Sequence, residues 1–264
     1  KALARINPHM PPSALEQAAH ALLSVSEPQM VVRNRSVHRL LLSGMMVEFA
    51  KGDEKKTDLV HFIDFTKPSN NDFLVVNQFT ITGTKQPRRP DVIAFVNGLP
   101  LAVVELKNPA NEQTDVWDAF NQLQTYKDEI GDLFSTNAAL VVSDGWTARV
   151  GSLTANAERM LPWRTLTSED DRPQLQMELE TVVRGFFRPE LFLDYVRHFV
   201  LFEQDGDAVI KKMSDIALNH PGVAHSIAFP GLSINGFTNS PNSGVVFVAL
   251  DDFELRKRLE LSAN

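Results

Sequence analysis

Two acidic residues and a lysine, Asp91, Glu105 and Lys107, have types and a spacing that could support hydrolytic chemistry. Carboxylate oxygens suit Mg²⁺, which keeps several of its waters and is usually completed by a substrate phosphate. A lysine beside such a pair could orient or deprotonate a water, or stabilise charge in the transition state. The trio therefore predicts a metal-dependent attack of water on a phosphodiester. The alternative is a lysine that bridges two structural acids, which is the more common meaning of an isolated Glu-x-Lys on a strand.

The elements that must position the trio are two short segments, residues 91–96 and 101–107, which are apolar and partly β-branched as strands are. Asn97 and Gly98 lie between them and are a strong hairpin signal. Both faces of this hairpin would be largely apolar, which is typical of strands inside a sheet with helices on each side. We therefore expect an α/β fold with a mixed β-sheet flanked by helices.

The length of the hairpin loop decides whether the trio can assemble. A three-residue loop over residues 97–99 would pair Val96 with Pro100, and therefore Asp91 with Glu105. The lysine two residues later would then share their face. A two-residue loop would turn Glu105 to the opposite face, because a shift of one residue exchanges the faces of a strand. The metal-site hypothesis therefore predicts the three-residue loop. This register and the preceding Pro90 shift the balance from a structural ion pair towards a site.

The residues around the trio resemble a known nuclease family. Pro90-Asp91 with Glu105-Leu106-Lys107 is similar to the PD-(D/E)xK nuclease motif. A closer resemblance is carried by residues 71–79, 88–91, 97–101, 105–109 and 143–155. These stretches resemble the N-terminal nuclease domain of the R (restriction and motor) subunit of type I restriction-modification enzymes. The resemblance covers about residues 1–212.

That resemblance implies a restriction-endonuclease-like fold and a Mg²⁺-dependent endonuclease that hydrolyses DNA. It implies that Asp91 and Glu105 bind the metal and that Lys107 is catalytic. The subfamily also carries a Gln-x-x-x-Tyr motif on the helix after the Glu-x-Lys strand, matched here by Gln122 and Tyr126. The implied partners are double-stranded DNA and the specificity and modification subunits. ATP belongs only to the resembled full-length enzyme, because this sequence has no Gly-x-x-x-x-Gly-Lys-Ser/Thr loop.

Residues 115–130 have the apolar spacing of a helix that packs on the sheet. Gln122 and Tyr126 are four residues apart and would lie on one flank of this helix. They could contact the DNA backbone or support the metal ligands. Without the resemblance, such a pair more often indicates a half-buried helix flank.

The formal net charge of −7 argues mildly against a nucleic-acid binder, which usually has a basic surface. Local basicity is still expected where phosphates would approach Asp91, because Lys85, Arg88 and Arg89 directly precede it. The chain has no cysteine, which excludes disulfides and thiolate metal sites and fits a reducing compartment. No apolar run reaches membrane-spanning length and no signal peptide is recognisable, so we expect no membrane association and a cytoplasmic location.

The order of elements along the chain predicts an α-β-β-β-α-β core. A capping-box pattern at residues 13–16 predicts a helix that continues to about Leu23, and residues 34–49 predict a helix and a strand. Two acids in this region, Glu16 and Glu48, are candidates for a third metal ligand. Further strands are expected over residues 59–65, 73–81 and 138–143, and further helices over residues 168–187 and 189–203.

The C-terminal segment, residues 213–264, departs from this pattern. From about residue 214 it resembles a stretch of the periplasmic porter domain of resistance-nodulation-division efflux pumps. About fifty residues of that domain are too few to imply pump activity. Residues 226–234 and 245–250 predict two strands joined by a loop rich in Gly, Asn and Pro. His220 and His225 are expected to be structural or exposed.

Two rival functions remain at this point. One is a non-catalytic, nuclease-derived module that serves only as a docking surface for partner subunits. The other is a stand-alone PD-(D/E)xK nuclease of DNA repair. Metal binding separates the first from an active nuclease, because a docking module does not need it.

Overall fold

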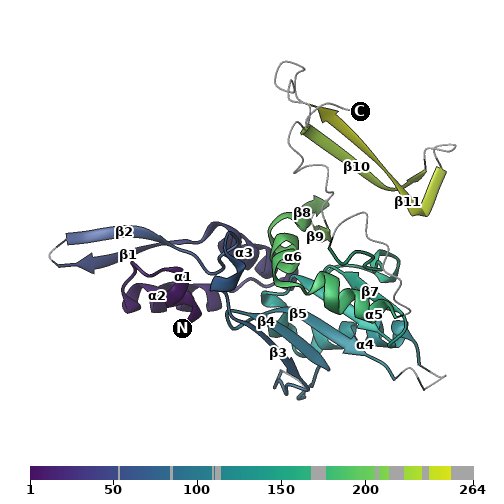
Figure 1. Ribbon diagram of the computed structural model, residues 1–264, viewed down its shortest axis with the longest axis horizontal. Helices are drawn as coiled ribbons and strands as arrows, with labels where there is room; N and C mark the ends of the chain where they lie inside the picture. Colours follow the sequence, from purple (N-terminus) through teal and green to yellow (C-terminus); the bar gives the residue numbers. More distant parts are fainter. Residues whose placement is uncertain are drawn as a thin grey trace. The chain divides into compact units, whose positions relative to one another are not determined.

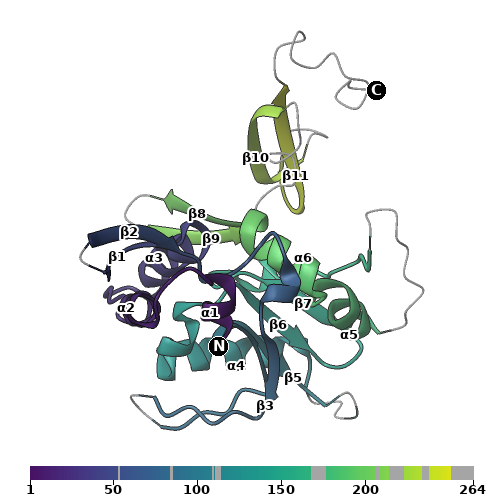
Figure 2. The ribbon, with the colours of Figure 1, turned by 60° about the vertical axis from the view of Figure 1, so that its left-hand side comes forward.

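The computed structural model describes residues 1–52, 54–83, 86–108, 110, 114–167, 177–205, 208–213, 223–233 and 238–250 (Figure 1). The chain divides into two compact units, Lys1–Lys212 and Met213–Asn264. The first unit contains a mixed five-stranded sheet with helices on both faces, as expected for an α/β fold (Figure 2). Within the described part of the chain, no helix has the length and apolar character needed to cross a membrane.

The central sheet has the strand order β3-β4-β5-β6-β7. Its strands are β3 (Phe73–Asn77), β4 (Val92–Val96), β5 (Leu99–Leu106), β6 (Ala139–Ser143) and β7 (Ala148–Gly151). Strands β5 and β6 pair in parallel, and the other neighbours pair antiparallel. The parallel pair requires a crossover connection, and helix α4 (Val116–Glu129) provides it.

The turn between β4 and β5 has two residues, so the prediction of a three-residue loop is wrong. Val96 pairs with Leu99, and the backbone φ angles of Asn97 and Gly98 are 53° and 85°. Two successive positive φ angles are those of a type I′ turn, which matches the right-handed twist of paired strands.

A bulge at Leu101 nevertheless restores the predicted pairing at the far end of the hairpin. The register shifts between Ala94 and Phe95, and beyond it Val92 pairs with Val104. Continuing this register by one pair places Asp91 opposite Glu105. The extra residue of the bulge thus compensates for the shorter turn.

Helix α4 confirms the helix predicted over residues 115–130. Asp115 is its N-cap and accepts hydrogen bonds from the backbone N–H groups of Trp117 and Asp118, and the Asp118 side chain accepts one from the backbone of Asp115. This reciprocal arrangement is a capping box. The buried face of the helix packs on one face of the sheet in a cluster that includes Ile93, Val103, Val116, Ala119, Leu123, Tyr126, Leu140 and Val142.

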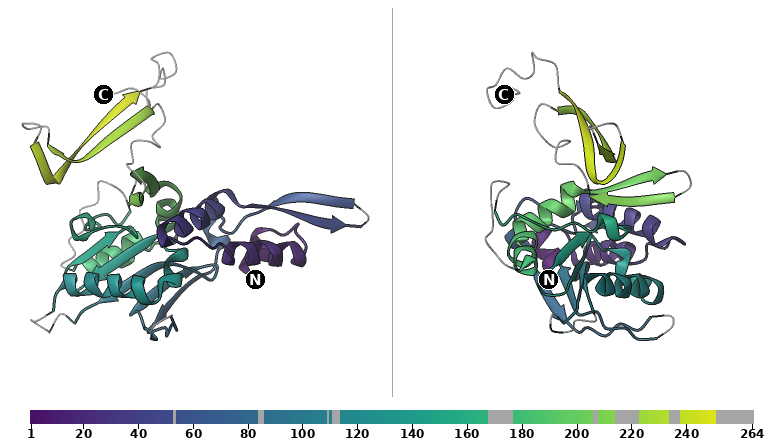
Figure 3. Two further views of the ribbon diagram at one scale, coloured as in Figure 1. Left: turned by 180° about the vertical axis from the view of Figure 1, so that it is seen from behind. Right: turned by 90° about the vertical axis from the view of Figure 1, so that its right-hand side faces the viewer.

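The remaining helices and strands of the first unit differ in part from those predicted from the sequence. They are α1 (Ala2–Ile6), α2 (Pro12–Leu23), α3 (Met30–Ser43), β1 (Met45–Lys51), β2 (Glu54–Val60), α5 (Glu178–Thr181), α6 (Pro189–Asp194), β8 (Val200–Asp205) and β9 (Ala208–Met213). Helix α2 is where it was expected, but it has no capping box: Pro11 is its N-cap, without a side-chain cap. The strand predicted over residues 59–65 ends at Val60, in a separate β1–β2 hairpin (Figure 3).

The helices predicted over residues 168–187 and 189–203 are only partly present. Residues 168–176 lie outside the described part of the chain. Helix α5 is followed by a π-helical turn, Val182–Phe186, and α6 by another, Tyr195–Phe199. The second helical segment therefore ends at Phe199, and β8 begins where helix was expected to continue.

The β8–β9 hairpin is held to the rest of the first unit by a buried lysine. Lys211 is 1% exposed, and its Nζ donates hydrogen bonds to Asn34 Oδ1, at 2.9 Å, and to the carbonyl oxygen of Asn137. The ring of Phe202 lies 5.3 Å from the same nitrogen. Burial lowers the pKa of Lys211 to about 7.

The second unit contains an antiparallel pair, β10 (Val223–Ser233) and β11 (Thr238–Leu250). Both predicted strands are therefore present, although residues 238–244, expected in the loop, belong to β11. His225 lies in β10, and His220 and Ile234 are outside the described residues.

Candidate active site

Asp91, Glu105 and Lys107 meet at one end of the β4–β5 hairpin. Asp91 directly precedes β4, and its Oδ2 accepts a hydrogen bond of 2.8 Å from the backbone N–H of Leu106. Lys107 follows β5, and its Nζ lies 3.6 Å from Glu105 Oε1. The backbone N–H of Lys107 donates to the carbonyl of Ser143 at the end of β6, which extends the parallel pairing to the site. The three residues singled out by spacing are thus brought together.

Glu105 is the most unusual of the three. Its side chain is 5% exposed, and its Oε2 has no hydrogen-bond partner within the described residues. Burial and, to a lesser extent, the nearby charge of Asp91 raise the pKa of Glu105 to about 7, and Lys107 opposes this shift. A buried carboxylate oxygen without a partner is costly, and a divalent cation would relieve both that cost and the repulsion between the two acids.

The donor set fits Mg²⁺ better than a metal held by a full protein cage. In the described parts of the chain, no cluster of three or more His, Cys, Asp or Glu residues could hold a metal ion. Mg²⁺ commonly takes one or two carboxylates and completes its octahedron with water and phosphate. Neither candidate for a third acid is in contact with the trio: Glu48 pairs with Lys55 of β2 at 2.7 Å, and Glu16 is exposed on α2.

Helix α4 brings Tyr126 to the trio. The Tyr126 hydroxyl is buried and donates a long hydrogen bond, 3.4 Å, to Glu105 Oε1. Burial, and then the charge of Glu105, raise the pKa of Tyr126 above its usual range, so the hydroxyl remains a donor. Gln122 lies one turn earlier on the same helix and is half-buried. The structure thus places Tyr126 against Glu105 and Gln122 on the adjoining turn.

The basic loop before Asp91 is anchored to the end of α4. Arg88 forms an ion pair with Glu129, and Arg89 is exposed. Lys85 lies outside the described residues. A Cβ atom on Gly83 would lie 2.0 Å from the carbonyl oxygen of Glu129, so this position has no room for a side chain. Of the three cations expected to meet DNA, Arg88 is therefore engaged within the protein.

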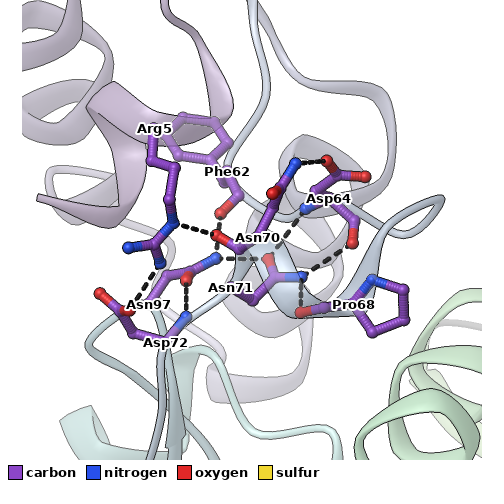
Figure 4. Close-up of polar contacts among 8 residues, drawn as sticks. All are labelled: Arg5, Phe62, Asp64, Pro68, Asn70, Asn71, Asp72 and Asn97. Atoms are coloured by element: carbon purple, nitrogen blue, oxygen red, sulfur yellow. Dashed lines mark hydrogen bonds and ion pairs between the residues drawn. The ribbon is translucent and has the colours of Figure 1, made fainter.

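The turn of the hairpin is fixed by a polar cluster centred on Asn97 (Figure 4). The Asn97 amide nitrogen donates to the carbonyl of Phe62 and to Asn71 Oδ1, and its Oδ1 accepts from the backbone N–H of Asp72, all at 2.8–2.9 Å. Asn71 in turn donates to the carbonyl of Asp64. These contacts hold the opposite end of the hairpin from the trio, so both ends of β4 and β5 are fixed.

Sequence reasoning missed one residue that contacts the trio. Gln78 Nε2 donates a hydrogen bond of 2.6 Å to Asp91 Oδ1, and the Gln78 backbone N–H donates to the Asp91 carbonyl at 2.9 Å. Gln78 follows β3, in a stretch that resembles the nuclease family, but no spacing rule connects a glutamine there with Asp91. Only the pairing of β3 with β4 brings them together.

The chain is similar to subunits of type I restriction enzymes. Residues 1–159 match the family model described as "Type I restriction enzyme R protein N terminus". The chain is 43% identical over 223 residues to the type I restriction enzyme HindI endonuclease subunit of Haemophilus influenzae, an alignment that covers 83% of this chain and 21% of that protein. It is 30% identical over 223 residues to the putative type I restriction enzyme MjaIXP endonuclease subunit of Methanocaldococcus jannaschii, covering 77% and 21% of the two chains.

A third relative, the type I restriction enzyme EcoprrI endonuclease subunit of Escherichia coli, is 25% identical over 169 residues, covering 62% of this chain and 53% of that protein. The chain spans about a fifth of the length of the first two relatives. The matched family model covers more than half of the chain and includes the trio. The chain belongs to the family of type I restriction enzyme R protein N-termini.

Proposed function

We propose that this chain is the nuclease domain of a type I restriction-modification R subunit and that it hydrolyses DNA phosphodiester bonds with a divalent metal, Mg²⁺. The observation that carries the proposal is the buried Oε2 of Glu105, which has no described partner and belongs to a carboxylate beside Asp91 and Lys107. Carboxylates with pKa values perturbed by burial and a neighbouring charge cluster at functional sites. The family membership of the chain supports the same activity.

Asp91 and Glu105 would hold the metal in this proposal. A bound Mg²⁺ supplies a Lewis acid for the scissile phosphate and lowers the pKa of a coordinated water. Lys107 lies close enough to Glu105 to orient the attacking water or to neutralise charge that develops on the phosphate. Tyr126 donates to Glu105 and so supports it from behind, and Gln122 would extend this support towards the DNA backbone.

The mixed sheet, with its Glu-x-Lys strand paired in parallel with β6 across α4, also supports a PD-(D/E)xK fold for the first unit. The proposed substrate is double-stranded DNA, which Lys85 and Arg89 would contact, while Arg88 would hold their loop against the end of α4 through its ion pair with Glu129. With a net charge of −7, the chain is expected to depend on the specificity and modification subunits for most of its hold on DNA. We further propose a cytoplasmic location for the protein and a role for ATP only in the full-length enzyme.

Calorimetric titration of Mn²⁺ or Mg²⁺ into the wild type and the Glu105→Ala variant tests the proposal, followed by a plasmid-nicking assay. Binding that is lost in the variant, together with metal-dependent nicking by the wild type, is the expected result. Binding without nicking would mean that the domain needs its partner subunits to cut. A wild type that binds no metal would overturn the proposal in favour of a non-catalytic docking module.

A further inference from the structure

Gln78 has a backbone conformation that its residue type rarely adopts. Its φ angle is +51°, in the left-handed region, where only a few per cent of non-glycine residues lie. Asn97 is the other non-glycine residue with positive φ in the described part of the chain, and its type I′ turn accounts for it. Gln78 lies in no such turn. Backbone strain of this kind costs about 1–3 kcal/mol and tends to occur at functional sites.

In this conformation the backbone N–H and the side-chain amide nitrogen of Gln78 both point towards Asp91. Immediately after β3, the Gln78 backbone N–H bonds to the Asp91 carbonyl at 2.9 Å, and its Nε2 bonds to Asp91 Oδ1 at 2.6 Å. Its amide must present nitrogen rather than oxygen to this contact, because an ionised carboxylate only accepts hydrogen bonds. The strained residue therefore binds the main chain and the side chain of one residue at once.

Asp91 is consequently held from two sides. Gln78 Nε2 occupies one lone pair of Oδ1, and the backbone N–H of Leu106 occupies one lone pair of Oδ2 at 2.8 Å. Each carboxylate oxygen keeps a further lone pair for a metal ion. The Leu106 contact alone would leave the carboxylate free to pivot about Oδ2, and the second contact at Oδ1 removes this freedom.

We propose that Gln78 is a positioning residue that holds the Asp91 carboxylate in the orientation that binds the divalent metal. The inference rests on the proposed function, since it takes Asp91 to be a metal ligand. Residues that orient metal ligands through hydrogen bonds typically change metal affinity by about 10–100-fold when they are replaced. A glutamine that only terminates β3 would affect the folded state without a specific effect on metal affinity.

Calorimetric titration of Mn²⁺ into the full chain separates these roles. Gln78→Ala removes the side-chain contact, and Gln78→Gly removes it while easing the positive φ, so the glycine variant is expected to fold even if alanine is not tolerated. Both variants should bind Mn²⁺ about 10-fold more weakly than the wild type. The melting temperature of the metal-free Gln78→Gly variant should stay close to that of the wild type. Asn77→Ala, which removes the neighbouring exposed amide on β3, is the matched control and should bind normally.

The outcomes distinguish this inference from the proposed function. Suppose that the wild type binds Mn²⁺ and that Glu105→Ala abolishes this binding. An unchanged Mn²⁺ affinity in Gln78→Gly would then overturn the role of Gln78 and leave the proposed metal site intact. An equal loss in Asn77→Ala would also overturn it, because the effect would then be a general weakening of β3. A wild type that binds no Mn²⁺ would overturn both proposals.

Discussion

Replacing Lys211 by methionine should change how the stability of the first unit depends on pH. Lys211 is buried with two oxygen acceptors, Asn34 Oδ1 and the Asn137 carbonyl, and burial lowers its pKa from 10.5 to about 7. Between these two values the unfolded chain keeps the proton and the folded chain has largely lost it. Because the unfolded state binds more protons there, the free energy of unfolding rises with pH. Below pH 7 both states are protonated and this contribution no longer changes.

The size of the effect follows from the shift. Each pH unit inside the window contributes up to about 1.4 kcal/mol per shifted group. Allowing for half-protonation of the folded state at pH 7, the wild type should gain about 2 kcal/mol from Lys211 between pH 7 and pH 9. Met cannot gain it. The substitution also leaves two oxygen atoms unpaired, which costs stability to the same extent at every pH. The informative quantity is therefore how the difference in the free energy of unfolding between wild type and Lys211→Met changes with pH.

Urea unfolding of the wild type and Lys211→Met at pH 7, 8 and 9 measures this difference. The stability of the variant relative to the wild type should fall by about 2 kcal/mol across the series. Lys67→Met, which removes an ammonium group from an exposed position, serves as the control. A difference that stays constant from pH 7 to pH 9 would show that Lys211 remains charged in the folded protein.

Three further predictions concern the hairpin. Lys107→Ala should abolish metal-dependent nicking while the circular dichroism spectrum and the Mn²⁺ affinity stay near those of the wild type; retained nicking would remove Lys107 from the chemistry. Glu105→Gln should remove metal binding and stabilise the metal-free protein by about 1 kcal/mol, because the repulsion between Asp91 and a buried carboxylate is lost; a lower melting temperature in EDTA would contradict this. Asn97→Ala should lower the free energy of unfolding by about 2–3 kcal/mol, because three side-chain hydrogen bonds are lost and alanine tolerates a positive φ less well than asparagine. Urea unfolding should show a smaller loss of stability for Asn97→Asp, which keeps one acceptor. Equal losses for the two variants would argue against the amide contacts.

The parts of the site that could be predicted are those carried by local patterns. The Asn-Gly turn, the apolar strands and the apolar stripe of α4 are short-range signals, and they predicted the hairpin that carries the trio and the helix that packs on the sheet. Tyr126 was singled out only by the family resemblance. The register from Val92 and Val104 to Ala94 and Ala102 agrees with the predicted one although the predicted turn is wrong, because Leu101 forms a bulge that the strand sequence does not mark. Bulges depend on how neighbouring strands pack, and a single strand does not contain that information.

The missed features depend on contacts between distant segments. Gln78 reaches Asp91 only because β3 pairs with β4, and Lys211 is buried only because β8–β9 folds back against α3. The capping box expected at residues 13–16 fails because Pro12, which is well suited to the first position of a helix, moves the start of α2 two residues earlier. The apolar spacing of residues 189–203 did not show where the helical conformation gives way to β8.

The bulge at Leu101 reverses which face of the sheet alternate residues of β5 occupy. Between the two-residue turn, Asn97 and Gly98, and the bulge, the turn alone decides which side chains face each way; beyond the bulge, towards Glu105, the assignment is the opposite. A one-residue insertion in the turn together with loss of the bulge would leave Glu105 facing the same way, whereas either change alone would reverse it. Relatives with loops of different length can therefore keep an identical site, provided that insertions and deletions along β5 occur in compensating pairs. If this hairpin is grafted into another sheet, the turn and the bulge must therefore be transferred together.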